Sequence, residues 1–163
     1  MSEQPRPIQM NPIGTVRRAN GSITVQIDAP YRPALKALDT FSHVIVFWWA
    51  VLYDEPQYRQ ALVVPLPYAE NREAGVFACR APVRPNLIMA TVCAIESVDE
   101  ASGEVRVTNI DAFDGTPVVD LKAYYPVTDR VQNAHISGYL EGWPEWFPTE
   151  GLGLMEGEGE SGS

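Results

Sequence analysis

Soft metal ligands are scarce in this sequence. Cys79 and Cys93 are its only cysteines, and His43 and His135 are its only histidines. Neither a C-x-x-C nor an H-x-x-x-H spacing occurs, so no metal site is expected. Both cysteines stand in apolar, strand-like contexts, where a free thiol packs as a small hydrophobic side chain. The sequence therefore predicts two buried, reduced thiols.

Long apolar runs are also lacking. The longest one, from Val44 to Tyr53, has about half of the roughly 20 residues that a membrane-spanning helix needs. The first ten residues contain Pro5, Pro7 and mixed charges, and a basic segment followed by an apolar run is not found there. We therefore expect a cytoplasmic protein without a membrane partner.

Basic charge is the third shortage. The chain has 12 Lys and Arg residues against 21 Asp and Glu, which gives a net charge of −9. Three of the acidic residues, Glu156, Glu158 and Glu160, stand near the C-terminus, but the rest of the chain stays negative without them. Proteins that bind nucleic acids usually present a basic field to the phosphates. The charge thus disfavours an RNA partner and favours a small molecule, unless arginines build a locally basic groove.

The common nucleotide-binding and hydrolase motifs are absent. Gly151-Leu152-Gly153 has neither a strand pattern before it nor a helix pattern after it, so it does not indicate a Rossmann or P-loop site. A G-x-S-x-G nucleophile elbow does not occur either. Any functional site must be built in another way.

Short alternating or apolar runs dominate what is present. With 14 prolines and 12 glycines between them, they indicate a mainly β protein whose six or more strands form a barrel or a sandwich. Helical spacing predicts one short helix over 31–38. The strand candidates are Ser22–Ile27, Ser42–Tyr53, Gln60–Val64, Val76–Cys79, Ile88–Val98, Val105–Ile110 and Val118–Ala123.

The two ends of the chain differ from its body. Residues 1–11 are expected to be a flexible N-terminus, and residues 151–163, made largely of Gly, Glu and Ser, a disordered acidic tail. Between them, 12–150 is expected to be one domain. The aromatic segment 142–148 favours packing against the body, with an interface or a lid over a ligand as the alternative.

Two segments contain charged residues within otherwise strand-like sequence. In 75–86, Pro82 and Pro85 restrict a loop that carries Arg80, Arg84 and Asn86, and arginine is the side chain that binds a carboxylate or phosphate through two hydrogen bonds. A loop with merely solvated arginines is the alternative.

The second segment covers 110–122. Asp114-Gly115 between two apolar runs predicts a hairpin turn. The turn does not account for Asp111, Asp120 and Lys122, and carboxylates in these places could accept hydrogen bonds from a ribose or an amine.

Together these segments resemble the TsaA-like (TrmO-type) family. Its typical forms read G-V-F-A-T-R-S-P-x-R-P-N-P-I-G and D-G-T-P-V-x-D-I-K-P-Y, and the similarity runs from about Pro12 to Asp129. Pro12–Val16 and Leu38–His43 also fit family elements, although His43 heads an apolar strand and is interpreted as a structural histidine. The chain resembles a short form, without the C-terminal domain of the longer bacterial tRNA enzymes.

The resemblance implies a single small β-barrel with one or two short helices that binds S-adenosylmethionine outside the Rossmann architecture, commonly as a homodimer. Characterised members methylate N6 of a threonylcarbamoyl-adenosine in tRNA. The cofactor residues that it implies are Phe77, Ala78, Arg80, Arg84, Pro85, Asn86, Asp111, Asp114, Gly115, Thr116 and Lys122.

Some family residues are replaced here. The serine of R-S-P is Ala81, and the family's P-R-Q segment is missing. The histidine that follows the core strand in the family is also missing, and Val51 or a neighbour takes its place. A methyltransferase acting on tRNA or a smaller acceptor is therefore one hypothesis, and a regulatory or sensing protein that binds S-adenosylmethionine without transfer is the other. The catalytic base is not identified.

Overall fold

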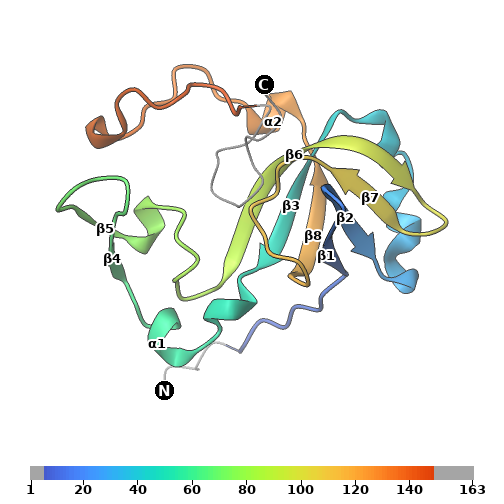
Figure 1. Cartoon of the computed structure of the whole chain (residues 1–163), viewed down its shortest axis with the longest axis horizontal. Helices are drawn as coiled ribbons and strands as arrows, with labels where there is room; N and C mark the ends of the chain where they lie inside the picture. Colours follow the sequence, from blue (N-terminus) through green and yellow to red (C-terminus); the bar gives the residue numbers. More distant parts are fainter. Residues whose placement is uncertain (1–5, 149–163) are drawn as a thin grey trace.

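Six antiparallel strands close into a barrel in the computed structural model, which describes residues 6–148 (Figure 1). Their order around the barrel is β1-β2-β7-β6-β3-β8, so the first and last strands also pair. The predicted mainly β barrel is confirmed. The strands are β1 Gly14–Ala19, β2 Ser22–Ile27, β3 His43–Trp49, β6 Ile88–Asp99, β7 Glu104–Val107 and β8 Pro117–Ala123.

Alternation of side chains produces the core. In β3, Val44, Val46 and Trp48 are buried, whereas the residues between them are partly exposed. Because the side-chain period of a strand is two, one set faces the barrel interior and the other faces outward. Cys93 of β6 is fully buried, Cys79 is 9% exposed, and neither forms a disulfide, as predicted.

A tight turn joins β1 to β2. Asn20 and Gly21 have φ values of 52° and 72°, the left-handed conformations that a two-residue hairpin turn needs. The strand register runs without interruption to Ala19 and Ser22 on either side of this turn. The hairpin therefore leaves no loop at the position of the family's P-R-Q segment.

The predicted helix over 31–38 is only partly correct. The structure has two 3₁₀ helices, η1 Ala29–Leu35 and η2 Leu38–Thr40, which are separated where Ala37 takes a φ of 67°. Pro33 lies inside η1 and lacks the amide hydrogen that a longer helix would use. Leu35 of η1 is buried and belongs to the barrel core.

A long excursion between β3 and β6 lies beside the barrel, with β4 and β5 on its far side (Figure 1). It contains η3 Val51–Tyr53, α1 Pro56–Arg59, β4 Val63–Pro65, β5 Glu73–Gly75 and η4 Val76–Ala78. Strands β4 and β5 pair only with each other. A second small cluster of Leu66, Ala69 and Cys79 packs here.

This excursion corrects three strand predictions. Residues 76–78 form a 3₁₀ turn instead of a strand, the strand expected over 60–64 covers 63–65, and β3 ends at Trp49. Apolar composition misled the prediction, because a buried Val76 and Cys79 also occur when a turn packs on a small cluster.

The chain after β8 contains α2 Pro126–Asp129 and η5 Gly138–Leu140, and it crosses over to the β4–β5 excursion (Figure 1). The Trp143 ring contacts Tyr68 with centroids 5.1 Å apart. Trp143, Trp146 and Phe147 are 47%, 66% and 48% exposed, so this aromatic segment contacts the body at Tyr68 but does not join the core. The predicted acidic tail lies outside the described residues.

No helix within residues 6–148 combines the length and apolar character required to cross a membrane. In the same part of the chain, no group of three or more His, Cys, Asp or Glu side chains is placed to hold a metal ion.

Candidate functional site

The loop from Val76 to Leu87 exposes most of its predicted site residues. Phe77 is 85% exposed, and Ala78, Arg80 and Asn86 are exposed as well. The prediction that Phe77 and Ala78 lie on a strand is wrong, because they belong to η4. Among the described residues Arg80 has no hydrogen bond or ion pair, so its guanidinium faces solvent.

Arg84 has different surroundings, because its side chain folds back onto its own loop. Its two terminal nitrogens donate to the carbonyl oxygens of Ala81 at 3.0 Å, Val76 at 3.1 Å and Cys79 at 3.4 Å. These bonds satisfy carbonyls that no strand pairing uses. Arg84 therefore fixes the shape of the loop that presents Arg80.

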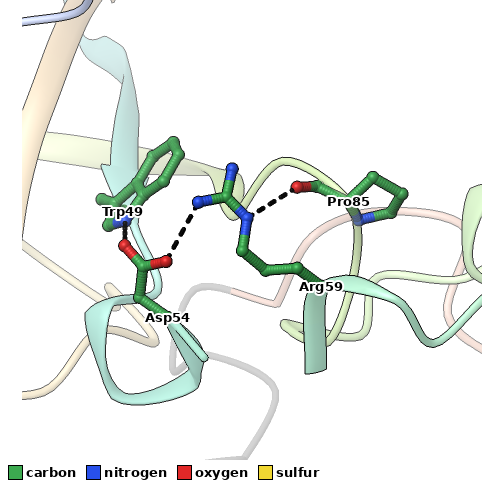
Figure 2. A network of polar contacts seen from close by, with 4 residues as sticks. All are labelled: Trp49, Asp54, Arg59 and Pro85. Carbon is green, nitrogen blue, oxygen red and sulfur yellow. Dashed lines mark hydrogen bonds and ion pairs between the residues drawn. The ribbon is translucent and has the colours of Figure 1, made fainter. Parts of the chain in front are cut away.

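Pro85 is held from outside the loop. Its carbonyl oxygen accepts a hydrogen bond of 3.0 Å from Nε of Arg59, which also pairs with Asp54 (Figure 2). Two residues further on, the Leu87 carbonyl accepts from the amide of Ala50 at 2.9 Å. The segment that follows β3 thus anchors the end of this loop.

The second predicted segment forms a turn that is pinned to β1. Gly115 has a φ of 83°, and the Thr116 amide donates to the Phe113 carbonyl at 3.2 Å, which confirms a turn centred on Asp114 and Gly115. Asp114 Oδ1 accepts from the Arg18 amide at 2.8 Å. Thr116 is buried, and its carbonyl accepts from the Val16 amide at 2.9 Å.

The turn is not a hairpin, contrary to the sequence prediction. The strands on either side of it, β7 and β8, are not neighbours in the barrel, since β7 pairs with β2 and β6 while β8 pairs with β1 and β3. Asp-Gly chemistry sets the local turn, but closure of the barrel decides which strands pair.

Asp111 is fixed by a chain of hydrogen bonds from the barrel interior. The Trp48 indole donates to Thr91 Oγ1 at 3.1 Å, and the Thr91 hydroxyl donates to the Asp111 carboxylate. The Arg18 guanidinium donates to the carbonyls of Ala112, at 2.8 Å, and Ile110. Asp111 is only partly buried, so the rest of its carboxylate stays within reach of a ligand.

The charge of Asp111 also affects a buried neighbour. Burial raises the pKa of the Cys93 thiol to about 12, and the nearby Asp111 carboxylate adds to this rise, while Arg18 opposes it. Cys93 therefore stays a neutral thiol and is not a nucleophile of the site.

Lys122 lies on β8, beyond the turn. Its Nζ pairs with Asp120 at 3.0 Å and sits 5.9 Å from the centre of the Phe47 ring. Both members of the ion pair are at least half exposed. The structure thus gives Lys122 an intramolecular partner, in contrast to Arg80.

Two polar loops result, and no hydrogen bond or ion pair between described residues joins loop 76–87 to turn 110–116. Two cavities lie elsewhere. One, of about 350 Å³, lies beside η1 and η2 and includes Tyr31, Leu38 and Tyr125, and the other, of about 400 Å³, lies against Leu35 and Asp99. None of the eleven predicted site residues lines either cavity.

Sequence reasoning missed the residues that hold these loops. Each is separated by 20 or more positions from the motif residue that it helps to hold. Arg18 contacts Asp114, Arg59 with its partner Asp54 holds Pro85, and Thr91 contacts Asp111. Arg18 offered a signal in the sequence, because a charged side chain on the half-buried strand β1 needs a partner.

A closed antiparallel barrel that carries polar loops defines a class of small non-Rossmann binding domains. The chain belongs to the TrmO family, because residues 3–130 match the model of the tRNA-methyltransferase O N-terminal domain.

Similar proteins agree with this family. A probable S-adenosyl-L-methionine-binding protein of Methanothermobacter thermautotrophicus is 34% identical over 139 residues, which cover 76% of this chain and 95% of that protein. One of Archaeoglobus fulgidus is 36% identical, over 79% of this chain and 33% of the relative. A mouse tRNA (adenine(37)-N6)-methyltransferase is 34% identical, over 63% of this chain and 23% of the enzyme.

Solved structures show the same fold. A crystal structure of TrmO from Pseudomonas aeruginosa is 28% identical, with a TM-score of 0.59 over 80% of this chain and 62% of that one. Another TrmO crystal structure is 26% identical, with a TM-score of 0.63 over 82% and 62%. The chain therefore spans less than two thirds of these structures and only a third of the Archaeoglobus relative.

Proposed function

We propose that this chain is an S-adenosylmethionine-dependent methyltransferase. The observation that carries the proposal is that both motifs of a TrmO-family sequence form ordered polar loops, each held by an arginine that donates to loop carbonyls. Relatives described as S-adenosyl-L-methionine-binding proteins support the choice of cofactor.

The free side chains fit the polar ends of that cofactor. Arg80 is exposed and has no internal partner among the described residues, so it can bind a carboxylate through two hydrogen bonds. Asp111 and Asp114 present carboxylates suited to hydroxyl or ammonium donors. Arg84, Pro85, Gly115 and Thr116 would support the two loops, and Phe77 and Asn86 are exposed on the first of them.

Catalysis rests mainly on positioning. The bound cofactor supplies a methyl group on a sulfonium centre, so the protein needs only to align the acceptor for displacement and exclude water. An exocyclic amine as acceptor must also lose a proton, and we propose that Asp111, Asp114 or a carbonyl of the acceptor takes it. Fixing Asp111 through Thr91 would keep its carboxylate oriented.

The acceptor that we propose is N6 of a modified adenosine in tRNA, supported by the mouse relative's described activity. The net charge of −9 opposes tRNA binding at long range and keeps a smaller acceptor as the second choice. For tRNA to bind, local arginines such as Arg17 and Arg80 would have to offset the negative electrostatic field of the protein.

One observation favours the alternative of cofactor sensing without transfer. The Asn20-Gly21 turn replaces the family's P-R-Q segment, and Val51 in η3 stands near the position of its histidine. If these family elements bind the acceptor, the chain would bind S-adenosylmethionine without methylating tRNA.

Incubation with S-adenosylmethionine, with and without bulk tRNA, separates the two functions. Formation of S-adenosylhomocysteine that requires tRNA supports the transferase, and calorimetric binding without turnover supports the sensor. Absence of binding by the folded chain would contradict both. We further propose that the protein is a cytoplasmic homodimer.

A further inference from the structure

A hydrogen-bond network connects the end of β3 to loop 76–87, which is called the cofactor loop below because we propose that it binds S-adenosylmethionine. The Trp49 indole donates to Asp54 Oδ2 at 3.0 Å, and the other oxygen of Asp54 accepts from Arg59 at 3.0 Å (Figure 2). Arg59 Nε then donates to the Pro85 carbonyl at 3.0 Å. The Arg59 guanidinium also lies 5.6 Å from the centre of the Trp49 ring. Three groups, the Trp49 ring, the Asp54 carboxylate and the Pro85 carbonyl, thus fix the Arg59 guanidinium.

The geometry of the network is better suited to orienting the Pro85 peptide than to stabilising the fold. Arg59 and Asp54 are each 38% exposed, and exposed ion pairs contribute little to folding. The planar guanidinium, however, has donors in fixed directions, so contacts to Asp54 and Pro85 together define the position of the Pro85 peptide. A single flexible ammonium group cannot hold both acceptors in the same way.

Pro85 lies between two residues whose placement matters for the proposed site. Arg84 on one side shapes the loop that presents Arg80, and Asn86 on the other side is exposed. Beyond Asn86 the chain is fixed, because the Leu87 carbonyl accepts from the Ala50 amide and the Leu87 side chain is buried, whereas the Pro85 carbonyl is held by Arg59. Release of the Pro85 carbonyl would therefore free the peptide on which Arg84 and Asn86 depend.

We propose that Arg59 and Asp54 are positioning residues for the cofactor loop, acting through the Pro85 carbonyl. This inference rests on the proposed binding of S-adenosylmethionine by that loop. Neither residue belongs to the predicted binding set, and neither is required to touch the ligand. Their effect is to reduce the number of loop conformations that the ligand must order on binding.

The expected effect of Arg59→Ala is a loss of about tenfold in S-adenosylmethionine affinity, since one charged hydrogen bond and its loop order are lost. Arg59→Lys keeps the charge opposite Asp54 and should recover only part of the affinity. Asp54→Asn keeps an acceptor for Trp49 but removes the charge that orients Arg59, so a smaller loss is expected. The melting temperature should stay within a few degrees in all three variants.

Two measurements on the full chain test the inference. Calorimetric titration with S-adenosylmethionine gives the affinity, and amide hydrogen exchange of residues 84–88 in the ligand-free protein reports loop order. Arg106→Ala is the matched control, because Arg106 is an exposed arginine whose guanidinium donates to Ser22 on the neighbouring strand β2. The control should change neither measurement.

Faster exchange over 84–88 together with weaker binding in Arg59→Ala supports the proposal. Unchanged affinity, or weaker binding without faster exchange, would overturn it. If wild type does not bind S-adenosylmethionine, the proposed function fails, and the exchange data still decide whether Arg59 orders the loop. If Arg59→Ala does not fold, the same comparison is made with Arg59→Lys and Asp54→Asn.

Discussion

Arg80 and Arg84 lie four residues apart on one loop but have different surroundings. Arg80 is exposed and unpaired within the described residues, whereas Arg84 donates to three carbonyls of its own loop. The sequence motif alone implies the same role, cofactor binding, for both arginines. Arg80 is therefore the residue that we propose to contact the ligand, and Arg84 is the one that orders the loop.

We predict opposite effects for their removal. Arg80→Ala should lower the binding free energy of S-adenosylmethionine by about 2–5 kcal/mol with little change in melting temperature, because it leaves a ligand carboxylate unpaired. Arg80→Lys should recover part of the loss. Arg84→Ala should destabilise the fold by about 1–3 kcal/mol, since it leaves loop carbonyls without donors. Calorimetry and thermal unfolding of each variant provide the check, and equal affinity in wild type and Arg80→Ala would refute the binding role.

Cys93 gives a second prediction for a single residue. Because its pKa is raised to about 12, the thiol should not react with Ellman's reagent at pH 8 in the native protein. A Cys79→Ser variant isolates this thiol, and reaction should follow only on unfolding. Rapid labelling of the native variant would contradict the burial of Cys93.

The same pKa has a consequence for stability. The folded state holds the thiol proton more tightly than the unfolded chain, where a cysteine titrates near 8.5. The contribution of the protonated Cys93 thiol to the free energy of unfolding is therefore fully present below pH 8.5. It is lost as the pH rises toward 12.

At the scale of elements, β1 closes the barrel. Gly14 pairs with Ile27 of β2 and Val118 of β8, so it sits where the first and last strands meet. A Cβ at this position would lie 2.2 Å from the Gln26 carbonyl oxygen, a backbone atom that cannot move without its strand. Only glycine permits this approach.

Gly14→Ala should therefore destabilise the protein by about 1–3 kcal/mol, the usual range for overpacking. Gly138→Ala is the matched control, since a Cβ there meets no atom within 4 Å. Urea unfolding of both variants measures the difference. A Gly14→Ala variant as stable as the control would show that β1 and β2 can separate without cost.

The excursion between β3 and β6 is the element that carries most of the site. It packs a separate cluster of Leu66, Ala69 and Cys79, against which Tyr139 of the C-terminal segment also lies. Arg72 adds a contact 5.4 Å from the centre of the Tyr139 ring. The C-terminal segment therefore packs on the excursion that contains the loop with Arg80.

At the scale of the whole molecule, exposed aromatic residues gather on the segment after β8. Trp143 and Trp146 are 47% and 66% exposed, and Tyr68 beside Trp143 is 45% exposed. Tryptophan and tyrosine in such numbers are typical of contact surfaces. This observation supports the homodimer that we propose.

Sedimentation velocity at micromolar concentration should therefore show a dimer, and Trp146→Ala should shift the equilibrium toward monomer by weakening an aromatic anchor. Tyr31→Ala is a suitable control, because Tyr31 is an exposed aromatic residue of η1 that lines the cavity beside η1 and η2. A wild-type monomer at these concentrations would contradict the proposal.

Several features were predictable from the sequence because they depend on neighbouring residues. Period-two alternation gave β2 Ser22–Ile27 with correct bounds and placed β8 to within one residue. Asp114-Gly115 specified a turn because glycine takes positive φ without strain. The family motifs predicted the barrel and the eleven candidate site residues.

Tertiary structure alone decided what these local features contact. The Asp114-Gly115 turn bridges strands that do not pair, because barrel closure places β6 and β3 between β7 and β8 on one side and β2 and β1 on the other. Arg84 turns inward because loop carbonyls need donors, and Arg59 reaches Pro85 across 26 positions. Hydrogen bonds between distant segments depend on how the whole chain satisfies its buried and half-buried polar groups, so no local pattern specifies them.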